Sequence, residues 1–201
     1  MTIKAIETRY NGCRFRSRLE ARWAVFFDAL GVPWEYEKEG FDLDGIRYLP
    51  DFWLPHMNMW AEVKGQSLMT DEWRKVIRLT YHTKTAALVL VGSIVSGMNI
   101  TLVIGIPPKL DESFEIEMLR QLGIVEEQDL ASIYDDVSWA ECPVCTRLCI
   151  GSEHSTELFS IVCQYCSSGN AKIRARLNKH DPRFTDSLVA AYTNARSARF
   201  E

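Results

Sequence analysis

Four cysteines in the last third of the chain constrain its fold more than any other feature. They form two Cys-x-x-Cys pairs, "CPVC" at 142–145 and "CQYC" at 163–166, with seventeen residues between the pairs. Each pair makes a tight turn that directs two sulfur atoms at one ion, and this spacing is typical of a four-thiolate zinc site in a ribbon-like fold. We therefore predict a structural Zn²⁺, which supplies much of the folding free energy of so small a module. Its predicted ligands are Cys142, Cys145, Cys163 and Cys166.

Two further metal-ligand types lie between these pairs, Cys149 and His154. We expect neither to bind the ion, because the two pairs already complete a tetrahedron. Cys13 is expected to be a half-buried thiol. Nothing indicates secretion, so metal binding explains the pairs better than a disulfide framework does.

Length and composition bound the remaining possibilities. The 201 residues, 47% of them apolar, suit one domain of ordinary size plus a small appendage. No apolar run approaches the ~20 residues that span a bilayer, and the N-terminus has no apolar signal core. We expect a cytoplasmic protein with no membrane partner.

Helix signals and strand signals alternate along the first half of the chain. Ser17 is a plausible N-cap with Glu20 three residues later, and apolar residues then recur at helical spacing until Gly31. Three strands are predicted next, in "WEYEKEGF", "GIRYLPDFWL" and "MNMWAEVKG". They are expected to be joined by short turns in an antiparallel meander. A second helix is predicted from a cap at Thr70. The nearly all-apolar runs at 86–91 and 100–106 suit strands buried on both faces, which predicts a mixed sheet covered by helices.

These elements predict three regions. Residues 1–110 form an α/β core, residues 111–137 an acidic and partly helical connector, and residues 138–201 a zinc ribbon with a basic segment. A terminal helix is expected from about 185 to 198, packing on either module.

Charge is distributed unevenly around a net value of −4. Residues 1–22 hold six Lys/Arg against two acids, residues 163–201 hold seven against three, and residues 111–141 carry ten acids and one Arg. The basic ends could contact phosphates while the acidic middle faces away, and solvated surfaces are an equal alternative on charge alone.

The segment "YLPDFWLPHMNMWAEVKG" at 48–65 contains a Pro-Asp pair, ten intervening residues and then Glu-Val-Lys. Alternate side chains share one face of a strand, so Glu62 and Lys64 are expected to point the same way while Val63 points into the core. A short turn after the preceding strand would bring Asp51 beside Glu62. Two carboxylates so placed make a hard oxygen site of the kind that Mg²⁺ favours.

Phosphodiester hydrolysis needs an oriented water and positive charge near the transition state. Mg²⁺ or Mn²⁺ held by Asp51, Glu62 and the backbone carbonyl of Val63 would meet the first need, and Lys64 would orient the water or neutralise charge. The structural alternative is that Pro-Asp is a common turn pair and Glu-x-Lys an ordinary surface alternation. Three nearby residues are interpreted as turn residues outside the site: Asp42, Asp44 and His56.

This pattern resembles the P-D...(D/E)-x-K signature of the restriction-endonuclease-like nuclease superfamily. Residues 14–55 are similar to small phage and prophage proteins that pair such a nuclease core with a cysteine-rich tail. The resemblance covers residues 9–107 and is loose beyond them. It implies a mixed β-sheet core flanked by helices, metal-dependent cleavage of DNA, and, for a phage-encoded protein, a location in the bacterial host cell.

The resemblance also implies further site residues. Many members carry an acidic residue on the helix before the sheet, aimed at the metal through a water, and Glu20 matches it. The alternative role of Glu20 is in a capping box, in which its carboxylate would accept a hydrogen bond from the backbone of Ser17. Gln66 would share the strand face of Lys64 and touch the scissile phosphate. Candidate contacts to DNA phosphates are Arg14, Arg16 and Arg18 before the helix, and Lys172, Arg174, Arg176, Lys179 and Arg183 after the second cysteine pair.

The sequence therefore predicts a Mg²⁺-dependent endodeoxyribonuclease with DNA as its partner. One alternative is a catalytically inactive DNA-binding or assembly adaptor that keeps the nuclease fold. Another treats the zinc module as a docking element for a phage or host protein. A homodimer is a further expectation, since nucleases of this fold that cut both strands commonly act as dimers.

Overall fold

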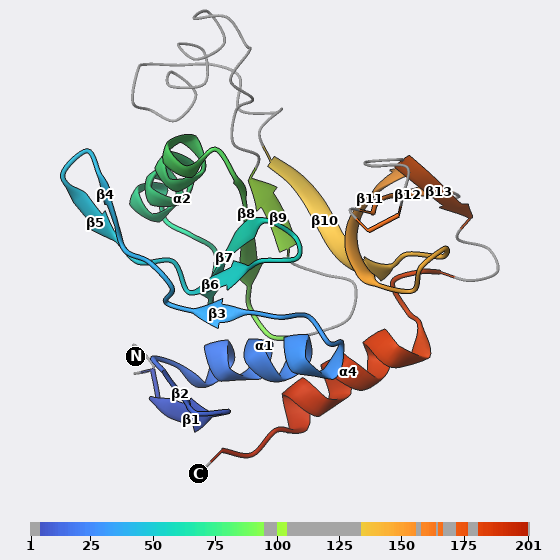
Figure 1. The fold of residues 1–201 in the computed structure, drawn as a ribbon, viewed down its shortest axis with the longest axis horizontal. Coiled ribbons are helices and arrows are strands. Elements are labelled where there is room, and N and C mark those ends of the chain that lie inside the picture. Colours follow the sequence, from blue (N-terminus) through green and yellow to red (C-terminus); the bar gives the residue numbers. More distant parts are fainter. Residues whose placement is uncertain are drawn as a thin grey trace, which may run out of the picture.

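The computed structural model describes residues 5–94, 100–103, 134–155, 158–163, 165–166, 172–176 and 181–200, and has a mixed α/β architecture (Figure 1). Its first elements are β1 Thr8–Tyr10, β2 Cys13–Phe15, α1 Arg18–Ala29, β3 Glu35–Tyr36, β4 Phe41–Leu43, β5 Ile46–Tyr48, β6 Phe52–Leu54 and β7 Met59–Lys64. They are followed by α2 Thr70–Thr83, β8 Ala86–Val91, β9 Ile100–Val103, β10 Tyr134–Glu141, β11 Leu148–Ser155, β12 Leu158–Val162, β13 Lys172–Arg176 and α4 Asp186–Ser197.

One nine-stranded sheet has the order β13-β12-β11-β10-β9-β8-β7-β6-β3. The pair β7–β8 is parallel and the other pairs are antiparallel, so the predicted mixed sheet is confirmed. The first half of β10 pairs with β9 and its second half with β11. The sheet therefore continues from the predicted core into the cysteine region, and β10 takes in the last four residues of the predicted connector. The rest of that connector, 111–133, lies outside the described residues.

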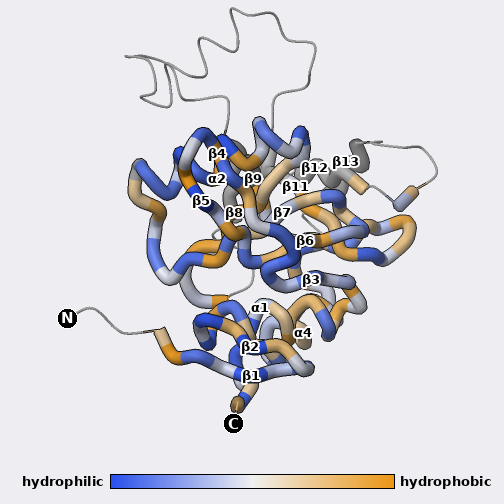
Figure 2. Tube along the Cα trace, turned by 60° about the vertical axis from the view of Figure 1, so that its left-hand side comes forward, coloured by the Kyte–Doolittle hydropathy of each residue, from blue (hydrophilic) through white to orange (hydrophobic). Residues whose placement is uncertain are grey.

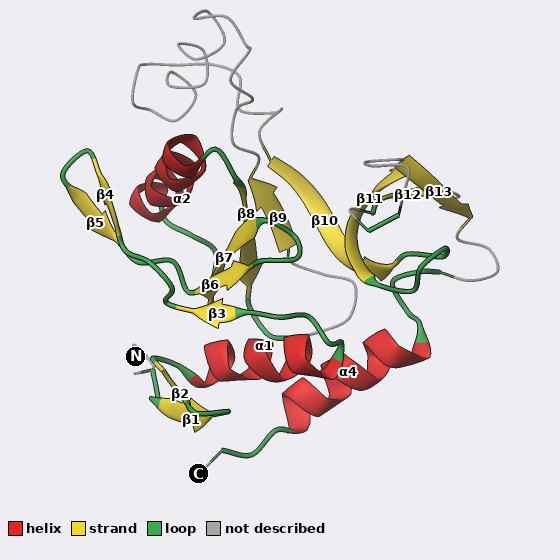
Figure 3. Cartoon of the chain, in the orientation of Figure 1, coloured by secondary structure: helices red, strands yellow, loops and turns green. Residues whose placement is uncertain are grey.

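Helices cover both faces of the sheet (Figure 3). Ala61 and Val63 of β7 belong to the buried cluster that includes α1 and α4, whereas Trp60 belongs to the cluster that includes α2. The same alternation holds in β8, where Leu88 faces the first cluster and Val89 the second. Because successive side chains of a strand point to opposite faces of the sheet, the apolar core is divided into two layers.

The predicted C-terminal helix is confirmed as α4, and it packs on α1. The rings of Phe26 and Tyr192 lie 4.7 Å apart, and Trp139 of β10 packs against Phe26 and Phe27 at 6.1 and 6.0 Å. Figure 2 shows α1 and α4 again adjacent from another side. The cysteine region thus shares its apolar core with the N-terminal half of the chain instead of forming an independent module.

Local structure departs from the sequence predictions in its strands and turns. The predicted strand "GIRYLPDFWL" is two strands, because Pro50 lacks an amide hydrogen and restricts the residue before it. Its first part pairs with β4 in a separate hairpin whose turn residues, Asp44 and Gly45, both have positive φ, which confirms Asp44 as a turn residue. A second hairpin, β1–β2, was not predicted, although Asn11-Gly12 is a strong turn signal.

Candidate functional site

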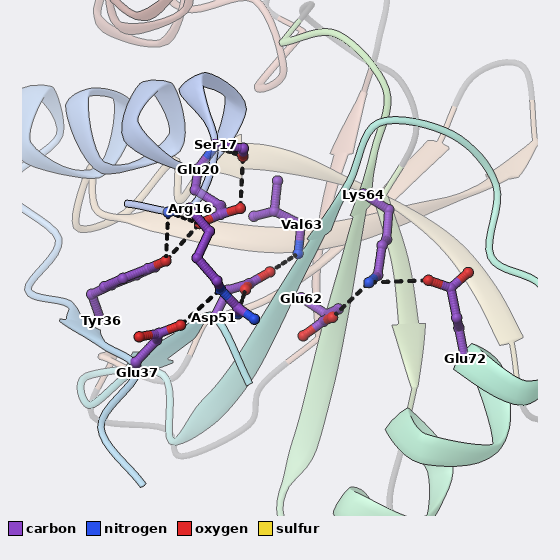
Figure 4. A network of polar contacts seen from close by, with 10 residues as sticks. All are labelled: Arg16, Ser17, Glu20, Tyr36, Glu37, Asp51, Glu62, Val63, Lys64 and Glu72. Atoms are coloured by element: carbon purple, nitrogen blue, oxygen red, sulfur yellow. Dashed lines mark hydrogen bonds and ion pairs between the residues drawn. The ribbon is translucent and has the colours of Figure 1, made fainter. Parts of the chain in front are cut away.

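Asp51 and Glu62 lie side by side on adjacent strands. Phe52 of β6 pairs with Ala61 of β7 in an antiparallel register. Asp51, the residue before Phe52, therefore stands opposite Glu62, the residue after Ala61. Their exposed fractions are only 3% and 6%. Buried carboxylates are costly without partners, so the neighbouring groups decide what the pair can do. Figure 4 shows these neighbours converging from α1, β3, β7 and α2.

Both oxygens of Asp51 have partners. Oδ2 accepts a hydrogen bond of 2.7 Å from the amide of Val63, and Oδ1 pairs with Nη2 of Arg16 at 2.6 Å. Burial and the nearby carboxylates of Glu62 and Glu20 nevertheless raise the pKa of Asp51 well above its usual value. The protein therefore supplies less positive charge here than these carboxylates would need to ionise freely.

Glu62 has one satisfied and one unsatisfied oxygen. Its Oε1 pairs with Nζ of Lys64 at 3.1 Å, whereas Oε2 is buried without a hydrogen-bond partner. The hydroxyl of Tyr48 is also buried without a bond of normal geometry, and burial followed by the charge of Glu62 raises its pKa well above 10. An unpartnered oxygen and an adjacent hydroxyl leave unused coordination capacity inside the site.

Lys64 stands on the same strand face as Glu62, as predicted, and Val63 is buried in the core. Nζ also pairs with Oε1 of Glu72 at 3.1 Å. Burial acts to lower the pKa of Lys64, but Glu62 and then Glu72 outweigh it and raise this pKa. The ammonium is therefore held in its charged form between two carboxylates.

Glu72 was missed by the sequence analysis. It lies in the first turn of α2, where it accepts a 2.9 Å hydrogen bond from the amide of Met69. Met69 is the N-cap residue, so the predicted cap at Thr70 is wrong by one position. A glutamate three residues after a helix cap is the sequence signal that could have predicted the contact between Glu72 and the Met69 amide.

Glu20 is buried beside the site, at the N-terminus of α1. The predicted cap is confirmed, since Ser17 Oγ accepts from the Glu20 amide at 3.2 Å. The Glu20 carboxylate, however, accepts from the Ser17 hydroxyl at 2.6 Å, the Tyr36 hydroxyl at 2.6 Å and the Arg16 amide at 3.0 Å. The predicted bond to the backbone of Ser17 is replaced by these three, which fix the carboxylate firmly.

The predicted DNA-contact residues near the site differ in their surroundings. Arg14 and Arg18 are exposed, and Arg14 pairs with Glu7. Gln66 is exposed but lies beyond the end of β7, so it does not share a strand face with Lys64. Far along the chain, Lys172, Arg174 and Arg176 occupy alternate positions of the outermost strand, β13, and Lys179 lies outside the described residues.

The four paired cysteines form one compact group, which confirms that part of the prediction. Their sulfur atoms all lie within 4.8 Å of one another, and the group could hold a metal ion such as zinc. The pairs Cys142–Cys166 and Cys145–Cys163 are 3.6 and 3.5 Å apart, too long for disulfides and close to the ~3.8 Å separation of sulfurs at ~2.3 Å from a tetrahedral zinc. Among the described residues, this is the only group of three or more His, Cys, Asp or Glu side chains close enough together to hold one metal ion. The carboxylates of Glu20, Asp51 and Glu62 do not form such a group in this structure.

The thiols around this cluster differ in their surroundings. Burial acts to raise the pKa of Cys163, but the amides of Tyr165 and Cys166 and the neighbouring thiols lower it to about 6. Cys149 is buried nearby but outside the group, and its sulfur lies 3.5 Å from the carbonyl oxygen of Arg147. The side chain of His154 lies outside the described residues.

A ring contact joins the cysteine cluster to the turn between the two site strands. The Tyr165 ring lies edge-on to His56 with centroids 6.2 Å apart, and the guanidinium of Arg147 lies 4.8 Å from the Tyr165 centroid. His56 stands in the turn between β6 and β7, as predicted. The cluster thus contacts the hairpin that carries Asp51 and Glu62.

Comparison of this chain with known protein families, with curated proteins and with solved structures found no match. Within the part of the chain that the structure describes, no helix is both long and apolar enough to cross a membrane. The assignment of the site therefore rests on the geometry of its own residues.

Proposed function

We propose that this protein is a Mg²⁺- or Mn²⁺-dependent endodeoxyribonuclease with a restriction-endonuclease-like core. The observation that carries the proposal is the burial of Asp51 against Glu62 with Lys64 on the same strand face. A purely structural role would not need two carboxylates of which one has a raised pKa and the other a buried, unpartnered oxygen.

The residues present fit a hard divalent cation. The donors are carboxylate oxygens, which hold more negative charge than their two protein cations balance. The backbone of Val63, whose amide binds Asp51, would add its carbonyl oxygen. When bound, such an ion would supply Lewis acidity toward water and a phosphate oxygen.

The chain's own residues have separate tasks in this proposal. The Val63 amide orients Asp51, while Glu20 is a positioning residue held by Ser17 and Tyr36. Two of the three Lys64 protons are directed at Glu62 and Glu72, which leaves the third to donate to a water or a phosphate oxygen. Arg14, Arg18 and Gln66 are exposed and would contact the DNA backbone.

The cysteine cluster is proposed to hold a structural Zn²⁺. Four thiolates complete a tetrahedron and leave no position for a substrate. Because the cluster lies on the same sheet as the carboxylates and contacts their hairpin through Tyr165, the zinc would stabilise the catalytic region as well as its own. The basic residues of β13 and the segment after it would extend the contact with DNA phosphates.

The test incubates purified protein with supercoiled plasmid, linear duplex, single strand and a four-way junction, each with Mg²⁺, Mn²⁺ or neither. Cleavage is expected only with the metal, and Asp51→Ala and Lys64→Ala are each expected to lower it by about 10²-fold or more. Asp71→Asn and Lys38→Ala are matched controls, since these exposed residues pair elsewhere, with Arg74 and Glu35. The preferred substrate would identify the subclass.

A second candidate function is an inactive DNA-binding or assembly adaptor. One observation favours it: Asp51 and Glu62 already have protein cations as partners, Arg16 and Lys64. If no substrate is cut with either metal while DNA binding is equal in wild type and in both alanine variants, the adaptor explains the protein better.

A further inference from the structure

The partner of Asp51 differs from the other cations at the site in how it is held. The Arg16 side chain is 54% exposed, yet its Nη2 reaches Asp51 Oδ1 at 2.6 Å, and that carboxylate side chain is only 4% exposed. Its Nε also pairs with Glu37 Oε1 at 2.7 Å. Arg16 thus bridges two carboxylates while much of its own side chain stays exposed (Figure 4).

The two oxygens of Asp51 are not equally available. Oδ2 is bound to the Val63 amide, which belongs to β7 and cannot move without disturbing the sheet. Among the described residues, the partner of Oδ1 is the long side chain of Arg16, for which a change of rotamer is enough to leave. A cation that binds Asp51 would therefore compete with Arg16 for Oδ1 and leave Oδ2 in place.

The surroundings of Arg16 allow its side chain to move while its backbone stays fixed. Its amide is directed at Glu20 Oε2 at 3.0 Å and at the Tyr36 hydroxyl at 3.1 Å. Glu37, the second partner, has a φ of +47°, which is uncommon for a residue other than glycine, and its amide bonds to the Asp51 carbonyl at 2.9 Å. Glu37 is therefore held near the site and could keep the guanidinium there after it leaves Asp51.

We propose that Arg16 is an internal counter-cation that competes with the divalent ion for Asp51 and, once displaced, stays on Glu37 with Nη2 free to bind a DNA phosphate. This inference rests on the proposed function and deepens it. It assigns Arg16 a role distinct from Arg14 and Arg18, which contact DNA without gating the metal. The metal affinity of the site is accordingly lower than its carboxylates alone would give.

The experiment measures Mn²⁺ binding directly, by calorimetry and by the loss of the free-ion electron paramagnetic resonance signal, on full-length protein without DNA. Arg16→Gln is expected to bind Mn²⁺ about tenfold more tightly than wild type, because one charge-assisted hydrogen bond no longer competes. Arg14→Gln removes the same charge two residues earlier, in β2, but the partner of Arg14 is the exposed Glu7, so the Mn²⁺ affinity of this variant should stay within about twofold of wild type. Asp51→Asn gives the background of binding elsewhere.

Ionic strength separates competition at Asp51 from the general effect of removing a positive charge. Raising KCl from about 0.05 to about 0.5 M screens long-range attraction, and the difference between Arg16→Gln and wild type should persist. If Arg16→Gln does not fold, Arg16→Lys provides the measurement. A lysine has one nitrogen where Arg16 places Nε on Glu37 and Nη2 on Asp51, so it should hold Asp51 less firmly and also tighten Mn²⁺ binding.

The outcomes distinguish this inference from the proposed function. Mn²⁺ binding that requires Asp51 but is equal in wild type and the Arg16 variants, or a difference that disappears at high salt, overturns the role of Arg16 alone. If no form binds Mn²⁺ through Asp51, the metal-dependent nuclease and the role of Arg16 both fail.

Discussion

The carboxylate site, formed by Glu20, Asp51, Glu62 and Lys64, and the cysteine cluster are two ligand-rich regions of one sheet, and they are prepared in opposite ways. The four thiols already lie within 4.8 Å of one another. The carboxylates instead have Arg16 and Lys64 as partners and form no comparable group. A structural metal needs ligands that converge on one point, whereas a catalytic site must exchange its ion and substrate and can keep its charge balanced by the protein meanwhile.

The difference also predicts what each region does for stability. The cysteine cluster is expected to stabilise the fold only when its metal is bound, since four thiols packed together gain little otherwise. The carboxylate site is expected to cost stability, because it buries charge that its partners do not fully compensate.

The largest expected effect is loss of the ion from the cysteine cluster. Purified protein should carry one zinc per chain, and Cys163→Ser should lose it. We expect this variant to melt about 10 °C lower, because loss of the ion destabilises β10 and β11, which contribute residues to the apolar core, by several kcal/mol. Metal content by mass spectrometry and melting by calorimetry check this. Cys13→Ser, outside the cluster, is the control. Wild-type protein that keeps its melting temperature after complete removal of zinc would contradict the structural role.

The opposite sign is expected at Asp51. Since its pKa is raised in the folded state, the folded protein keeps this proton to a higher pH than the unfolded chain does. The unfolding free energy should therefore fall as pH rises from about 4 through the folded-state pKa. Asp51→Asn should remove this loss and, at pH 8 without Mg²⁺, be more stable than wild type by on the order of 1 kcal/mol, while cleavage is lost.

Urea unfolding of zinc-loaded protein between pH 5 and pH 8 measures this change, with Asp181→Asn as a control of opposite sign. Burial acts to raise the pKa of Asp181, but Arg183 outweighs it and lowers this pKa. That variant should lose stability to the same extent at pH 5 and pH 8, because both lie above the ordinary pKa of an aspartate and the deficit would vanish only below it. A wild type and Asp51→Asn with parallel pH profiles would show that the carboxylate site carries no such cost.

A smaller effect is expected at Glu72, which holds Lys64 from α2. Glu72→Gln removes a carboxylate that raises the pKa of Lys64, so the alkaline limb of the cleavage rate should move to lower pH. We expect kcat to fall about threefold to tenfold with little change in KM. Asp71→Asn removes a carboxylate from the same helical turn and should leave the profile in place. An unmoved alkaline limb in Glu72→Gln would limit Glu72 to capping α2.

The smallest effect tests whether the two regions communicate. His56→Ala should cost about 0.5–1 kcal/mol of stability through loss of the Tyr165 ring contact, with zinc content unchanged and cleavage within about twofold. His82→Ala, which loses a similar contact to Phe41 on the other face, is the control. In a double-mutant cycle with Tyr165→Leu, strictly additive losses would show that the hairpin and the cysteine cluster are energetically independent.

Much of the fold could be predicted because its signals are local. The helix that begins at Arg18 follows from a capping residue and a period of 3.6, and β8 follows from a continuous apolar run. The split at Pro50 was also readable, since proline acts on its own backbone and that of the preceding residue. The continuity of the sheet through β10 could not be predicted. It depends on the pairing of β9 with β10, two strands that are far apart in the sequence.

By itself, the sequence determined which side chains are candidate ligands: two cysteine pairs with zinc-type spacing, and two carboxylates beside a lysine. Ligand chemistry and strand periodicity are properties of residue type and short-range order, so they survive without knowledge of the fold. Only the tertiary structure decided that Arg16 reaches Asp51 across 35 positions and that Glu72 of α2 reaches Lys64. Such pairings depend on how helices pack on the sheet, and that packing is a property of the whole core.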